Sequence, residues 1–228
     1  MIFPHKLKLF TVLFIVLLVK TGVCHAQKQR SEPRVIDSMK RIIQANRQMQ
    51  ASLNLLLGNA LDLAAYYRQS NTDSAIHYYE KSLEMAEKIN VDTLVGFVQE
   101  QLGNLYLQKG MSYTALEYFF RNYKLFESKG EKGAMAYALC DIGNTYFANG
   151  LYGVAETYYK QSLPIFESIQ EYHGQSVIYN NLGMIKDALK EYDSAIYFYS
   201  QALRLRQQRG DQFGILHTRT YLAQDYCK

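Results

Sequence analysis

Few side chains in this sequence could perform acid–base, nucleophilic or metal chemistry, and those few are widely separated. The histidines downstream of His25 are His77, His173 and His217, and none has a cysteine or carboxylate at the spacing of a zinc-ligand pair. Cys140 has no matched histidine, and the chain contains neither a glycine-rich phosphate loop nor a Ser/His/Asp set. We therefore predict no catalytic residues, no cofactor-binding residues and no metal site.

Amide side chains are the polar groups that recur at a regular spacing. Asn104 and Asn144 lie one period of 40 residues apart, and Asn181 falls close to the same line. An amide both donates to and accepts from a peptide backbone, so a row of amides can hold an extended segment without reading its sequence. The alternative, that these asparagines are solvated or hold adjacent helices together, stays open at this point.

The elements that must position these asparagines are repeats. The segment Leu102 to Tyr106 recurs at 142–146 and 182–186 and begins again at Leu222, in steps of 40 residues. A second series keeps the same period and pairs an alanine with an aromatic four residues later: Ala75 with Tyr79, Ala115 with Phe119, Ala155 with Tyr159, and Ala195 with Tyr199. Such self-similarity is the signature of a repeat architecture.

Each repeat has the pattern of a helical hairpin. Apolar residues recur at helical spacing, and small residues such as Gly143 and Ala155 stand twelve apart, where they would let two helices approach closely. We expect Gly143 to face the partner helix and its neighbour Asn144 to face a binding groove. Gly110 and Gly150 are expected in the turns, and Gly130 and Gly210 at helix C-termini. The expected N-caps of second helices are Asp73 or Ser74, Ser112, and Asp193 or Ser194.

These residues resemble the tetratricopeptide (TPR) family in its form of about forty residues per repeat. Leu102-Gly103 with Tyr106, then Ala115 with Phe119, matches the pattern, and the following unit matches equally. The third unit departs from it, because Lys186 replaces the first-helix tyrosine. The resemblance covers roughly residues 50–228. It is closer still to exported bacterial TPR sensor regions that precede histidine kinases or transcriptional regulators.

The resemblance implies an all-α fold, a right-handed superhelical solenoid of antiparallel helix hairpins. We expect a helix at 35–48, about four hairpins and an unpaired final helix. The expected helix pairs are 51–68 with 73–89, 93–109 with 112–128, 133–149 with 152–168, and 173–189 with 192–208, and the final helix begins near Phe213.

In this family the first helix of each hairpin lines a concave groove that binds a protein or peptide. By register, the predicted partner-binding groove consists of Phe97, Glu100, Asn104, Leu107, Tyr137, Asn144, Phe147, Asn180, Asn181 and Met184. Family members that grip a free C-terminal carboxylate add lysines and an arginine to such asparagines. The corresponding places here hold Glu100, Cys140, Asn180, Tyr137 and Val177, so we do not expect carboxylate binding.

The N-terminus reads as an export signal. Lys6 and Lys8 precede an apolar run from Leu9 to Val19, too short for the ~20 residues that span a bilayer, and Ala26 offers a cleavage site. Lipid modification at Cys24 and a retained anchor are the alternatives. Residues 1–26 carry three lysines and no acid, so the remaining chain has 22 basic against 21 acidic side chains. A charge near zero disfavours nucleic acid as a partner.

These observations predict three parts: a signal peptide at 1–26, a basic segment with a capping helix at 27–50, and a TPR array at 51–228. The predicted function is a non-catalytic binding scaffold in the periplasm or cell envelope, the sensory region of a bacterial signalling protein. A free-standing envelope assembly adaptor is the alternative, and part of a longer enzyme such as a sensor histidine kinase is the third reading. Membrane contact is expected only through the signal segment or a further C-terminal region. Ile215, Leu216, Leu222 and Tyr226 are expected to leave apolar surface at the last helix, where copies could self-associate.

Overall fold

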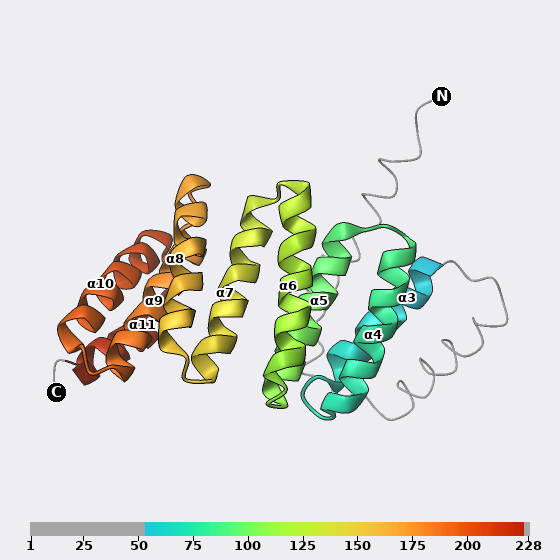
Figure 1. Cartoon of the computed structure of the whole chain (residues 1–228), viewed down its shortest axis with the longest axis horizontal. Helices are drawn as coiled ribbons and strands as arrows, with labels where there is room; N and C mark the ends of the chain where they lie inside the picture. The colour runs from blue at the N-terminus through green and yellow to red at the C-terminus, as the bar shows by residue number, and fades with distance from the viewer. Residues whose placement is uncertain (1–52, 226–228) are drawn as a thin grey trace. The chain divides into compact units, whose positions relative to one another are not determined.

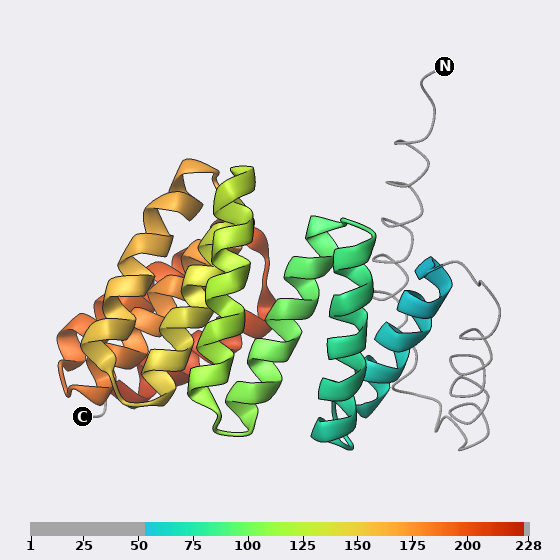
Figure 2. The same cartoon turned by 45° about the vertical axis from the view of Figure 1, so that its right-hand side comes forward.

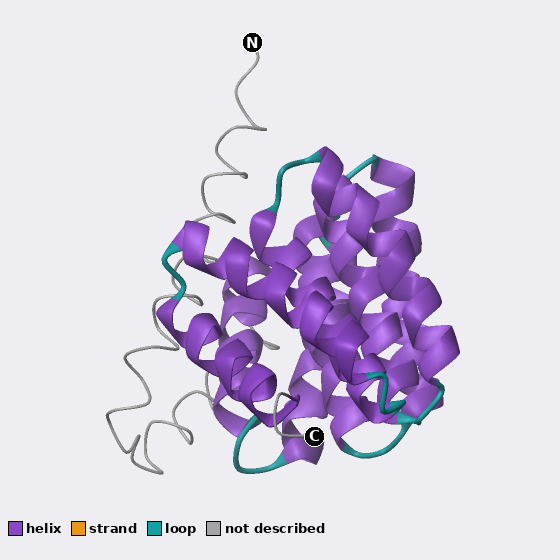
Figure 3. Ribbon diagram, turned by 90° about the vertical axis from the view of Figure 1, so that its left-hand side faces the viewer, coloured by secondary structure: helices purple, strands orange, loops and turns teal. Residues whose placement is uncertain are grey.

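The computed structural model of this chain describes residues 53–225, and that range consists of helices and loops without strands (Figure 3). The predicted signal peptide, the segment 27–50 with its helix at 35–48, and Tyr226 lie outside the described residues. The helices are α3 (Leu53–Tyr67), α4 (Thr72–Lys88), α5 (Asp92–Gln108), α6 (Ser112–Lys129), α7 (Lys132–Ala148), α8 (Tyr152–Ser168), α9 (Tyr172–Ala188), α10 (Tyr192–Arg209) and α11 (Gln212–Asp225). Their bounds agree with the predicted ones to within two residues.

The chain divides into two compact units, which meet inside α5 between Val98 and Gln99. In the first unit α3 packs against α4, and the two helices lie side by side in both Figures 1 and 2. α3 buries Leu57, Leu61 and Ala64, and α4 buries Ala75 and Tyr79. The predicted alanine–aromatic pair therefore faces the interior of this hairpin.

The second unit runs from Gln99 through α11 and is a succession of antiparallel helices. α7 packs on α8 and α9 packs on α10, while α6·α7, α8·α9 and α10·α11 contacts join successive hairpins. Figure 1 shows these helices following one another in chain order from α6 to α10. Burial of one face of every helix against its neighbours supplies the core, as expected when each hairpin cannot cover its own apolar face.

Glycine in the first helix and an aromatic ring in the second fit together in each hairpin of this unit. A Cβ added to Gly143 would lie 2.5 Å from Cε1 of Tyr159, far inside van der Waals contact. The same relation holds for Gly103 with Phe119 at 2.5 Å and for Gly183 with Tyr199 at 2.6 Å. The prediction that these glycines face the partner helix is confirmed, and the reason is that the ring occupies the space of the missing side chain.

The turns alternate between glycine and larger residues in the left-handed region. Gly110 and Gly150 have φ of +74°, and Gly130 and Gly210, which end α6 and α10, have φ of +69°. Three other turns use non-glycine residues with positive φ, namely Asn90 at 49°, Gln170 at 55° and Lys190 at 62°. These turns were harder to locate from sequence, because glutamine and lysine carry no signal for this conformation.

The predicted helix N-caps are wrong. In α4 the cap is Asn71, whose side chain accepts a hydrogen bond from the Ser74 backbone N–H at 3.0 Å. Met111 and Glu191 precede α6 and α10 without a side-chain cap bond. Ser112 instead donates through Oγ to Oδ1 of Asn149, at 3.0 Å, and so links two successive turns.

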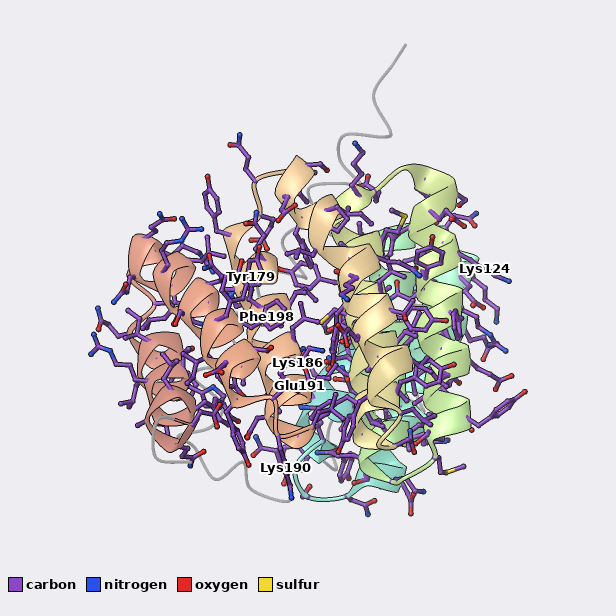
Figure 4. The ribbon with its side chains drawn as sticks, turned by 60° about the vertical axis from the view of Figure 1, so that its left-hand side comes forward. Lys124, Tyr179, Lys186, Lys190, Glu191 and Phe198 are labelled. Carbon is purple, nitrogen blue, oxygen red and sulfur yellow. The ribbon has the colours of Figure 1, made fainter. Side chains whose placement is uncertain are left out.

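The lysine that interrupts the tyrosine pattern has its own partners. In the two preceding hairpins, Tyr106 stacks on Tyr118 and Tyr146 stacks on Tyr158, with ring centroids 5.6 and 5.4 Å apart. Lys186 at the next equivalent position lies 3.3 Å from Oε2 of Glu156 and 3.3 Å from Oε2 of Glu191 (Figure 4). An ion-pair network thus replaces the ring stack, and Lys186 does not weaken the repeat.

Candidate functional site

The predicted groove residues differ in how much of each side chain reaches the surface. Asn104 and Tyr137 are exposed, whereas Asn180 is only 4% exposed. The remaining members are half-buried: Phe97, Glu100, Leu107, Asn144, Phe147, Asn181 and Met184. Phe97 belongs to the first compact unit and the others to the second. The face of α5, α7 and α9 that carries these residues in the second unit, from Glu100 to Met184, is called the groove face below.

Asn144 is the centre of a hydrogen-bond network that joins three helices. Its Oδ1 accepts from the Tyr159 hydroxyl of α8 at 2.8 Å and from Nδ2 of Asn181 of α9 at 2.9 Å. Its Nδ2 points to the sulfur of Cys140 at 3.8 Å, and Asn181 lies 3.9 Å from the same sulfur. The expectation that Asn144 serves mainly a ligand needs correction, because its carbonyl oxygen is already used twice within the protein.

Asn180 is likewise committed to the interior. Its Oδ1 is 3.5 Å from Nη1 of Arg206, a guanidinium that is only 8% exposed. The same Nη1 donates to the backbone carbonyl of Gly214 at 2.9 Å and to the Thr218 hydroxyl. Arg206 therefore ties α9, α10 and α11 together, and Asn180 is part of that joint and not of an open surface.

Tyr137 combines an exposed ring edge with an anchored hydroxyl. The hydroxyl donates to Oε2 of Glu171 at 2.9 Å, and the ring meets Phe166 edge-on with centroids 4.8 Å apart. Burial of the ring and the bond to Glu171 raise the pKa of Tyr137, so it stays a neutral phenol. Burial works to raise the pKa of Glu171 too, but the hydrogen bonds from Gly174 N–H and Tyr137 outweigh it and lower that pKa.

The groove face carries a carboxyl group that sequence reasoning did not select. Burial and the nearby Glu100 raise the pKa of Asp141 well above its usual range, while a hydrogen bond from Asn144 works in the opposite direction. Asp141 follows the groove position Cys140 by one residue, so a register argument places it off the groove line. Only the packing of α5 against the same surface brings Glu100 close enough to be felt.

Cys140 is unsuited to nucleophilic chemistry. The side chain is 4% exposed, and burial together with Asp141 raises the pKa of the thiol, which keeps it protonated. Among the described residues, no group of three or more His, Cys, Asp or Glu is placed to hold a metal ion. A membrane-spanning helix is likewise not found between residues 53 and 225. What the groove face offers chemically is therefore hydrogen bonding and apolar contact.

The tetratricopeptide repeat family model matches the chain twice, at residues 92–168 and 134–208, and a second model of the same description matches residues 64–89. The two overlapping matches together span more than half of the sequence. No curated protein matches it.

Solved structures share the fold at low sequence identity. BtubC (BKLC) from P. vanneervenii superposes with a TM-score of 0.70 at 20% identity, over 87% of this chain and 84% of that one. The apo form of RapI gives 0.74 at 15% identity, over 97% and 71%. A STAND protein from Pyrococcus horikoshii with a tetratricopeptide repeat sensor gives 0.73 at 18% identity, over 97% of this chain and 33% of that one. The predicted fold class, an all-α TPR array, is confirmed.

Proposed function

Because the chain belongs to the tetratricopeptide repeat family, we propose that it is a non-catalytic scaffold that binds a protein or peptide segment along the groove face. One observation carries the proposal. At each of two registers, three successive first helices present partly exposed side chains, Asn104, Asn144 and Met184 at the first, and Leu107, Phe147 and Asp187 at the second. Neighbouring positions on the same helices are buried against second helices, so this is the face left for a partner.

The chemistry of the groove face favours an extended segment with apolar side chains. Asn104 is exposed and supplies an amide for backbone hydrogen bonds. Leu107, Tyr137, Phe147 and Met184 supply half-buried or exposed apolar surface, of which methionine and tyrosine are typical of adaptable binding surfaces. With Asn144 and Asn180 engaged internally, we assign the amide contacts to Asn104 and to the remaining donor of Asn181.

We further propose that this binding takes place outside the cytoplasm, in the sensory region of a signalling protein. The leader pattern at 1–26 supports export. The structural likeness to a signal-transduction ATPase whose repeats are a sensor supports the sensory role by analogy of fold alone. Cell fractionation and N-terminal mass analysis in the native host test the first part: a chain that starts at Gln27 supports it, and a full-length cytoplasmic chain contradicts it.

The binding proposal is tested with residues 27–228 and a library of extended peptides. Tyr137→Ala should weaken binding of a selected peptide by about tenfold or more, the usual effect of removing an interfacial aromatic anchor. The matched control is Tyr113→Ala, because Tyr113 is 78% exposed and lies on the second helix α6. Equal losses for the two variants would contradict the assignment of the groove face.

A further inference from the structure

The last described helix exposes a face that is buried in the other first helices. α11 packs its Ile215, Thr218 and Leu222 toward the rest of the unit, and these are at most 9% exposed. On another side Leu216 is 67% exposed, and Thr220 and Ala223 are exposed as well. These three residues, Leu216, Thr220 and Ala223, are called the α11 face.

The repeat period shows what this face does elsewhere in the chain. The equivalent residues are Ala136, Cys140 and Gly143 in α7 and Ser176, Asn180 and Gly183 in α9, all of them buried. In each case the second helix of the same hairpin provides the cover. Tyr159 of α8 lies over Gly143, and the Ser162 hydroxyl of α8 donates to the Ala136 carbonyl at 2.8 Å. Among residues 53–225, no helix takes this place on α11.

The side chains of the α11 face match those of one covered helix more closely than the others. α3 has Leu57, Leu61 and Ala64 at the equivalent positions, 1%, 2% and 0% exposed. Leucine at the first position and alanine at the third are shared between α3 and α11, where α7 and α9 have a smaller residue at the first position and glycine at the third. The helix that covers α3 is α4.

The match to α3 specifies the chemistry of a partner. α4 buries Ala75, Tyr79 and Ser82, each at most 2% exposed, in the hairpin that it forms with α3. An aromatic residue is therefore compatible with alanine as well as glycine on the opposing helix, and a small residue three positions later leaves room for leucine. A helix with this Ala-x3-Tyr-x2-Ser pattern would bury the exposed apolar surface of Leu216, at roughly 25 cal/mol per Å² of apolar area.

We propose that the α11 face is a docking site for an amphipathic helix of the α4 type, which completes a further hairpin with α11. This is a binding surface separate from the groove face and does not depend on the proposed function. An isolated helix of this length is marginal in water, so a free peptide must fold as it binds and its affinity is reduced accordingly. The test therefore uses the helix both free and joined.

In the experiment, hydrogen exchange of residues 212–225 is followed in the full chain with a peptide of residues 71–89 added up to about millimolar concentration, the range in which weak helix–helix association becomes measurable. In parallel, residues 72–89 are joined after Lys228 through the turn residues Leu189, Lys190 and Glu191, which preserves the register of the other hairpins. We expect exchange in α11 to slow by about tenfold or more in the joined protein, since its amides then lie in a covered helix.

Two variants make the test specific. Tyr79→Ser in the added helix should remove most of the protection, and so should Leu216→Glu in α11, a surface substitution that leaves the existing core untouched. The control is Phe213→Ser, because Phe213 is 84% exposed but its equivalents His173 and Gly133 are not on the covered face. Protection by the free peptide that follows the same variants supports the proposal further.

Three results would overturn the proposal. The first is unchanged exchange in α11 with the joined helix. The second is protection that persists with Leu216→Glu. The third is a full chain that is a dimer in light scattering and becomes a monomer with Leu216→Glu, since the occupant of the face would then be a second copy.

Discussion

Replacing Gly143 by alanine tests the way in which the hairpins hold together. The new Cβ would lie 2.5 Å from Cε1 and 2.7 Å from Cδ1 of Tyr159, and the ring is 1% exposed and held by its hydroxyl bond to Asn144. Because the ring cannot swing into solvent, the helices must separate, and overpacking of this kind costs about 1–3 kcal/mol. Alanine in a helix gains ~1 kcal/mol over glycine. The net expectation is a loss of about 0–2 kcal/mol of unfolding free energy.

The matched control is Gly58→Ala in α3. Gly58 lies inside a helix, and an added Cβ there has nothing within 4 Å, so only the gain of ~1 kcal/mol remains. The two variants should therefore move in opposite directions in thermal melts, with shifts of roughly 2–4 °C per kcal/mol for a chain of this size. Hydrogen exchange in α7 and α8 should show the loss locally, since repeat units can unfold separately. A Gly143→Ala protein as stable as Gly58→Ala would refute the packing argument.

Other substitutions test individual contacts. Asn144→Ala should lower the unfolding free energy by about 1–3 kcal/mol, as it leaves the buried Tyr159 hydroxyl without its acceptor, and chemical denaturation measures it. Gln170→Gly should stabilise by up to ~1 kcal/mol, because φ of 55° favours glycine; a loss in denaturation midpoint would contradict this. Asp141→Asn should raise the melting temperature at pH 7, since the carboxyl has a raised pKa and is strained when charged; the gain should shrink as the pH falls through the folded-state pKa of Asp141. Glu171 has a lowered pKa, so its contribution is present above its ordinary value of 4.5 and is lost as the pH falls below it; Glu171→Gln should flatten the stability curve in that acid range.

The fold could be predicted because the repeat signal is redundant. Gly103, Gly143 and Gly183 each mark the same close approach, and a helical period that holds through four units fixes the helix bounds. Turn glycines such as Gly110 and Gly130 added the breaks between helices. Positions that depart from this pattern were the ones placed wrongly, such as the caps, because a serine near a helix start has several competing partners.

The groove residues were harder to judge, since register gives direction but not engagement. Asn144 and Asn104 occupy the same register, yet one is bonded to Tyr159 and Asn181 and the other is exposed. The difference comes from residues on neighbouring repeats, where Asn181 and Tyr159 reach Asn144 from α9 and α8. A single repeat does not contain that information. The same holds for Asn180, whose partner Arg206 comes from α10.

The central claim, binding along the groove face, is tested most directly by mapping where a bound segment protects the protein. A peptide selected against residues 27–228 is added at saturation, and side-chain footprinting compares the two kinds of helix. The account predicts protection of Leu107, Tyr137, Phe147 and Met184 on α5, α7 and α9, with no change at Tyr113 and Tyr197, which are 78% and 58% exposed on second helices. Protection of Tyr113 and Tyr197 with the four groove residues unchanged would contradict it.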